Sequence, residues 1–84
     1  MNKRKLLFKA LSSPNNLPFK EMVVLVEAFG FRLSRINGSH HLFTHPEISE
    51  LINLQEKNGK AKAYQVRQFL QLVEEYDLEL GDER

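Results

Sequence analysis

Residues 35–46 read Arg-Ile-Asn-Gly-Ser-His-His-Leu-Phe-Thr-His-Pro, and this stretch decides how the rest of the chain is interpreted. All three histidines of the protein lie within it. The Asn-Gly pair at 37–38 is a strong signal for a tight β-hairpin turn, because such turns need positive φ angles. We therefore predict a hairpin of two strands, 31–36 and 39–45, closed by Pro46, which cannot donate a hydrogen bond to a sheet.

The segments on either side of the hairpin show helical spacing of apolar residues and one further strand pattern. Gly30 follows the second predicted helix at the position of a left-handed C-cap. The last predicted helix has an apolar face made of Val66, Phe69, Leu70, Val73 and Tyr76. Outside the hairpin, the sequence predicts helices over 3–11, 18–29 and 63–76, a strand over 51–55, loops over 12–16 and 47–50, and a turn over 56–60.

This order of elements predicts an α+β domain, in which the helices cover one face of a three-stranded antiparallel sheet. The chain has 84 residues, which leaves room for a single core. We expect residues 1–17 to form a basic helix and loop that extend a core domain over residues 18–84.

The composition excludes several classes of protein. The longest apolar run, residues 22–26, is far too short to cross a membrane. The basic first residues are not followed by the long apolar region of a signal peptide. The chain has no cysteine, which excludes disulfides and thiolate metal sites. We expect a cytoplasmic protein with no membrane partner.

The formal net charge of +1 hides an asymmetry. Residues 1–73 hold 11 Lys and Arg against 5 Asp and Glu, whereas residues 74–84 hold 6 acidic residues and one arginine. A basic body favours an anionic partner, although an acidic end that only aids solubility fits equally well. Lys60, Lys62 and Arg67 lie at the start of the last predicted helix, where cations oppose the helix dipole. A phosphate bound there would be held by side chains and free backbone amides, but ordinary surface lysines are an alternative.

The alternation of a strand places the histidines on two faces. Ser39, His41, Phe43 and His45 share one face, while His40 points to the other. If Asn-Gly at 37–38 forms a two-residue turn, Ser34 lies opposite His41. A bulge after the glycine would change this register.

Three chemical interpretations of the histidines remain open. Metal chelation is disfavoured, because His41 and His45 are separated by roughly 13 Å along a strand and His40 points the other way. Acid–base chemistry fits, because an imidazole exchanges a proton near neutral pH. Such a histidine would deprotonate a ribose 2′-hydroxyl while cations stabilise the charged phosphorane; the candidate cations are Arg32, Arg35, Lys60 and Lys62. Polar strand residues beside a turn are the third interpretation.

The segment Gly38-Ser39-His40-His41, followed by Phe43 and His45-Pro46 between two helices, resembles the HicA toxins of bacterial type II toxin–antitoxin pairs. The resemblance covers about residues 18–76. It implies a fold like the double-stranded-RNA-binding domain, ribosome-independent cleavage of mRNA, and a HicB-type antitoxin that covers the active histidine. The residues before position 18 are an addition to the family pattern.

The same resemblance implies a role for individual residues. The family's essential histidine falls on His41, and Gly38 and Ser39 match the turn that places it. His40 and His45 are candidate auxiliary residues, and Lys60 and Lys62 match a region that meets the RNA backbone. We expect no metal and no small-molecule cofactor. A non-catalytic RNA- or protein-binding module of the same fold is the alternative, and a purely structural partner protein is a third possibility.

Overall fold

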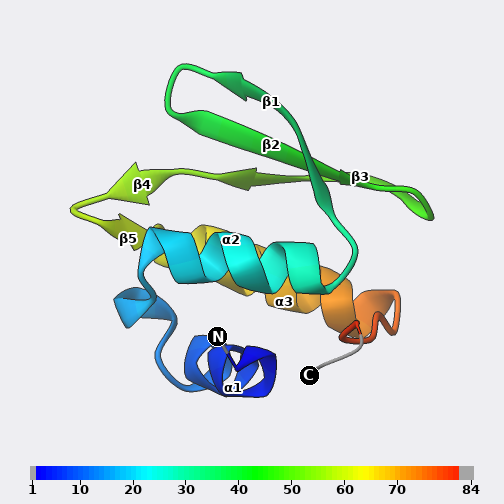
Figure 1. The fold of residues 1–84 in the computed structure, drawn as a ribbon, viewed down its shortest axis with the longest axis horizontal. Coiled ribbons are helices and arrows are strands. Elements are labelled where there is room, and N and C mark those ends of the chain that lie inside the picture. The colour runs from blue at the N-terminus through cyan, green and yellow to red at the C-terminus, as the bar shows by residue number, and fades with distance from the viewer. Residues whose placement is uncertain (1, 82–84) are drawn as a thin grey trace.

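The computed structural model describes residues 2–81 and has the predicted α+β architecture (Figure 1). Its elements are α1 (Lys3–Ser12), the short 3₁₀ helix η1 (Pro14–Asn16), α2 (Phe19–Ala28), β1 (Arg32–Asn37), β2 (His40–His45), β3 (Ile48–Leu54), β4 (Glu56–Lys57), β5 (Lys60–Ala61) and α3 (Ala63–Glu75). No helix within this described part is long and apolar enough to cross a membrane.

The elements form three layers (Figure 1). Strands β1, β2 and β3 make an antiparallel sheet in that order, and α2 and α3 cover one of its faces. Helix α1 lies on the far side of α2 and α3 from the sheet. Strands β4 and β5 form a separate two-stranded hairpin that leads into α3. The predicted sheet with helices on one face is therefore confirmed.

The part of the core that lies between the sheet and the helices contains several packed aromatic side chains. Phe31 lies edge-on to Phe69 of α3, with ring centroids 5.8 Å apart, and both are fully buried with Phe43 of β2. Helix α1 adds Leu6 and Ala10 to this same core cluster. Burial of large apolar side chains is the main favourable term in folding, so α1 contributes to the stability of the whole molecule.

Two features fix how α2 is joined to its neighbours. The Lys9 ammonium on α1 lies 3.1 Å from the Glu21 carboxylate on α2. At the other end, Gly30 has a φ of +96° and its amide donates to the carbonyl of Glu27. Gly30 therefore ends α2 in the left-handed conformation, as predicted from its position.

The predicted position of the hairpin turn was wrong by one residue. The turn residues are Gly38 and Ser39, because Asn37 pairs with His40 as the last pair of the ladder. Gly38 has a φ of +62° and Ser39 is not among the positive-φ residues, which is the pattern of a type II′ turn. As a result Ile36, and not Ser34, lies opposite His41, and the ladder shifts again between Leu33 and Arg35.

The predicted polar connection over 47–50 was also wrong. Strand β3 already begins at Ile48, so only Pro46 and Glu47 turn the chain. Within 56–60, Asn58 and Gly59 both have positive φ and join β4 to β5, the pattern of a type I′ turn. The start of β3 was not predicted because this part of the strand has one face open to solvent and carries polar residues there.

The expected burial of Tyr76 is not found. Helix α3 ends at Glu75, and Tyr76 is its C-cap with 38% of its surface exposed. The buried positions of α3 are Gln65, Val66 and Phe69. A glutamine thus occupies a core position on this helix.

Candidate active site

His41 lies on β2, near the Gly38-Ser39 turn, and its half-buried ring faces α2. The ring lies edge-on to that of Phe19, with centroids 4.9 Å apart and an interplanar angle of 63°. Phe19 is the first residue of α2, so the N-terminal end of that helix forms one wall around the imidazole. Edge-to-face packing fixes the plane of the imidazole without using either nitrogen.

The hydrogen bond made by His41 decides which ring nitrogen is free. Nδ1 of His41 lies 3.3 Å from the backbone carbonyl oxygen of Ser39. A carbonyl oxygen only accepts, so a neutral ring that keeps this bond carries its proton on Nδ1. Nε2 then presents a lone pair, which is what a general base needs.

A basic groove lies beside the β4–β5 hairpin and the start of α3. It has a volume of about 540 Å³ and is lined by Lys57, Lys60 and Lys62 together with Tyr64. Tyr64 is 49% exposed, so its ring offers a face to an aromatic ligand. No side chain caps the first turn of α3 and that turn holds no acidic residue, which leaves the positive end of the helix without a compensating charge.

Phe19 joins the basic groove to the surroundings of His41. Its backbone amide donates to the carbonyl of Gly59, at the turn between β4 and β5, over 3.0 Å. Its ring contacts His41. The preceding Pro18 forms a β-bridge with Lys60. Lys60 and His41 are therefore brought to the same end of α2, and Lys62 lines the same groove as Lys60. A site for an extended polyanion requires such an arrangement.

The other two histidines have different surroundings. Nδ1 of His40 lies 3.1 Å from the side-chain oxygen of Asn53. By strand alternation the His40 side chain points to the face of β2 opposite the buried Phe43. The ring of His45 packs edge-on against Phe31 at 5.0 Å, and its Nδ1 accepts from the amide of Glu47. Strand parity thus separates His40 from His41 and His45, as predicted.

The two arginines lie apart from the groove. Arg32 donates to the carbonyls of Glu27 and Phe31 and so covers the C-terminal end of α2. Arg35 pairs with Leu42 in the ladder, and its side chain is exposed. The structure therefore does not bring Arg32 and Arg35 together with Lys60 and Lys62.

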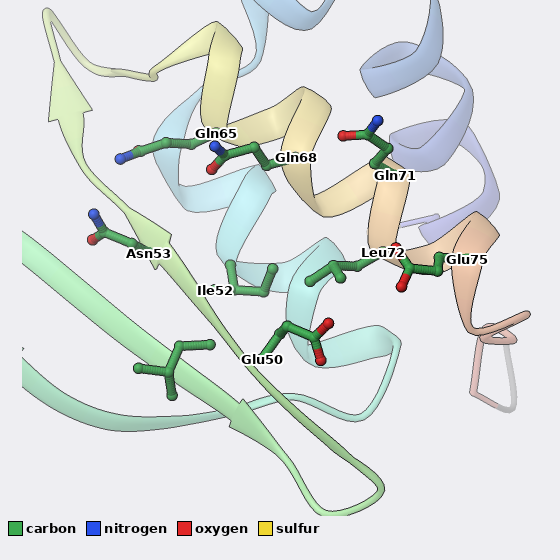
Figure 2. A pocket seen from close by; sticks show the side chains of 9 residues that line it. Glu50, Ile52, Asn53, Gln65, Gln68, Gln71, Leu72 and Glu75 are labelled. Carbon is green, nitrogen blue, oxygen red and sulfur yellow. The ribbon is translucent and has the colours of Figure 1, made fainter.

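A second groove, of about 230 Å³, lies between β3 and α3 (Figure 2). Gln65 and Gln68 line it from α3, while Asn53 and Glu50 line it from β3. The carboxylate of Glu50 also accepts a hydrogen bond from the Tyr76 hydroxyl over 2.6 Å. This hydrogen bond, with the nearby negative charge, raises the pKa of Tyr76 to about 12. None of the three histidines lines this groove.

Sequence reasoning missed Phe19, Lys57 and Tyr64 as site residues and gave Gln65 no role. Gln65 had a usable signal, since it lies four residues before Phe69 on the core-facing side of α3. A polar residue at a core position needs hydrogen-bond partners. Within residues 2–81, no group of three or more histidines or carboxylates is placed to hold a metal ion.

Comparison with known proteins gives one family. The model of a family described as the HicA toxin of bacterial toxin–antitoxin matches residues 19–74. The match includes the Gly38-Ser39 turn, His41 and the basic residues of the β4–β5 hairpin, and it excludes α1. No curated protein and no solved structure matches the chain.

Proposed function

The chain belongs to the HicA toxin family of bacterial toxin–antitoxin systems, and from this membership we propose that it is an endoribonuclease that cleaves mRNA with His41 as its general base. The observation that carries the proposal is the state of the His41 ring. Its Nδ1 is engaged by the Ser39 carbonyl, so Nε2 is the nitrogen that can accept a proton.

In the proposed mechanism, Nε2 of His41 takes the proton of a ribose 2′-hydroxyl, and the 2′-oxygen attacks the adjacent phosphorus. The bond from phosphorus to the 5′-oxygen of the next nucleotide breaks, and that oxygen leaves with a proton from solvent. The products are a 2′,3′-cyclic phosphate and a 5′-hydroxyl end. His41 then returns its proton to solvent.

The RNA is proposed to lie along the basic groove. Lys57, Lys60 and Lys62 would contact the phosphate backbone, and lysines near the scissile phosphate would stabilise the charged phosphorane. The exposed ring of Tyr64 is suited to stacking on a base. Arg32 and Arg35 are the weaker candidates, because one covers the end of α2 and the other lies on the exposed strand β1.

Family membership implies a cognate antitoxin, which we propose to be of the HicB type and to cover the His41 side of the molecule. Leu33 and Ile36, on β1 opposite Phe43 and His41, are 45% and 56% exposed and supply apolar surface for such a partner. We also propose that the fold is a relative of the double-stranded-RNA-binding domain, which reads RNA through phosphates and 2′-hydroxyls.

Replacement of His41 tests the proposal directly. We expect His41→Ala to abolish RNA cleavage and growth inhibition while its circular dichroism spectrum stays that of the wild type. His40→Ala changes the neighbouring histidine on the opposite face of β2 and is expected to keep most of the cleavage. Full cleavage by His41→Ala would refute the catalytic assignment. RNA binding without any cleavage by the wild type would favour the non-catalytic module.

The proposed chemistry uses no metal ion, which is a separate test. Cleavage by the wild type is expected to continue in the presence of EDTA. Loss of cleavage that is restored by a divalent cation would contradict the mechanism while leaving the family assignment unchanged.

A further inference from the structure

We infer that Gln55 and Gln65 are positioning residues, which set the orientation of the His41 imidazole through a directed chain of hydrogen bonds ending at Ser39. The inference rests on the proposed function of His41. Neither glutamine contacts the imidazole, so both act through the turn that precedes it.

The chain begins at Gln65, whose side chain is 1% exposed although it is polar. Its Oε1 accepts from the backbone amide of Gln55 over 2.7 Å. A backbone N–H can only donate, so this bond fixes which end of the Gln65 amide faces Gln55. Nε2 of Gln65 then has to donate, and it does so to Oε1 of Gln55 over 2.9 Å and to the Tyr64 hydroxyl over 3.3 Å.

The second hydrogen bond of the chain connects Gln55 to the turn. Because Oε1 of Gln55 is occupied by Gln65, Nε2 of Gln55 points away, and it donates to Oγ of Ser39 over 3.3 Å. Gln55 itself is held at both backbone groups, since its carbonyl also accepts from the amide of Lys62. Ser39 is thereby tied to the start of α3, although it lies in the turn between β1 and β2.

The last link reaches the imidazole. The hydroxyl of Ser39 accepts a hydrogen bond from Gln55, and its backbone carbonyl accepts one from His41, so a single residue makes both bonds. Gly38 and Ser39 are exposed and lie at the end of a hairpin, where a free turn would move easily. Gln65 is buried, and both its amide oxygen and its amide nitrogen are hydrogen-bonded, which makes it a rigid anchor. Through the half-buried Gln55 it supplies the rigidity that the turn lacks.

Three variants separate positioning from folding. Gln55→Met keeps the size of the side chain and removes both amide links, while the backbone bond to Gln65 remains. Ser39→Ala removes the hydroxyl that accepts from Gln55 and keeps the backbone carbonyl that bonds to His41. Gln71→Met is the matched control. Gln71 lies on α3 and, like Gln65, lines the groove between β3 and α3, but it is not part of the chain of hydrogen bonds.

Two measurements on the full chain decide the inference. Nitrogen NMR of His41 gives the fraction of neutral ring with its proton on Nδ1, and this needs no RNA. Steady-state cleavage of a short RNA gives kcat and KM separately. We expect Gln55→Met and Ser39→Ala each to lower the Nδ1–H fraction and to lower kcat by about tenfold with less than a twofold change in KM. The double variant should be no worse than either single variant, because both break one chain.

An unchanged Nδ1–H fraction in Gln55→Met overturns the inference, as does an effect confined to KM or an equal loss in Gln71→Met. Failure of the proposed function looks different. In that case the wild type cleaves no RNA, yet the NMR measurement still shows whether the glutamines orient His41.

Discussion

The ring of Phe19 lies edge-on to the imidazole of His41 at a centroid distance of 4.9 Å. This contact makes the first residue of α2 part of the wall around the proposed base. The same residue holds the β4–β5 turn through its backbone amide. Phe19 is therefore the residue through which the sheet, α2 and the basic groove meet.

Removal of the Phe19 ring should lower both catalysis and stability. We expect Phe19→Ala to lower kcat several-fold, because the imidazole loses the surface that fixes its plane. The free energy of unfolding should fall by only about 1–2 kcal/mol, less than for a fully buried phenylalanine, since Phe19 is half-buried. Phe19→Leu is the control that restores most of the buried area without the aromatic edge. Urea unfolding and cleavage kinetics check both values.

Two glycines with positive φ should respond differently to alanine. A Cβ on Gly38 meets no atom within 4 Å, so Gly38→Ala adds only backbone strain of about 1 kcal/mol. A Cβ on Gly30 would lie 3.0 Å from Nε2 of His45, so Gly30→Ala adds a contact as well as strain. We expect the larger loss of stability at Gly30. Equal losses in the free energy of unfolding, measured with urea, would show that the His45 side chain moves away from the added methyl group at no cost.

Charge removal in the basic groove should weaken RNA binding in a salt-dependent way. Lys57→Gln, Lys60→Gln and Lys62→Gln are each expected to reduce the slope of log affinity against log salt by about 0.7 for a single strand. Lys5→Gln, an exposed change on α1, is the matched control. Binding measured with the inactive His41→Ala protein avoids cleavage. An equal reduction of the slope by Lys5→Gln would show that RNA responds to the overall positive charge and not to the basic groove.

The Tyr76–Glu50 hydrogen bond gives a pH dependence at high pH. It raises the pKa of Tyr76 from 10.0 to about 12, so it favours the neutral phenol in the folded state. The stabilisation is present below pH 10 and is lost as the pH rises toward 12. Titration of tyrosinate absorbance should show one group near 12, and Glu50→Gln should bring it back toward 10.0. A titration unaltered by Glu50→Gln would contradict the assignment.

The sequence was sufficient for features that depend on local patterns. Helical spacing predicted α2 and α3, Gly30 was recognised as a C-cap, and strand alternation separated His40 from His41. These features depend on residues close together in the chain. Local rules therefore predicted most of the fold, whereas the proposal of His41 came from the resemblance to a known family.

Register and buried polar contacts were beyond those rules. Asn37-Gly38 and Gly38-Ser39 are both acceptable turns, and only pairing across the sheet selects the second. The partner of Gln65 is Gln55, ten residues away across the β4–β5 hairpin, and no spacing predicts that contact. Likewise Phe19 reaches His41 only because α2 packs across the sheet.

Strand β1 has a consequence for how the molecule opens. All six of its residues are exposed, and it pairs with β2 alone at one edge of the sheet. Local opening begins where few buried contacts must be broken, so β1 should exchange its amide hydrogens faster than α2, which is covered by both the sheet and α1. The Gly38-Ser39 turn directly follows this easily opened strand, and the Gln55–Ser39 hydrogen bond ties the turn to the start of α3. Local opening of this edge on heating would then displace the proposed base, His41, while the aromatic core is still intact.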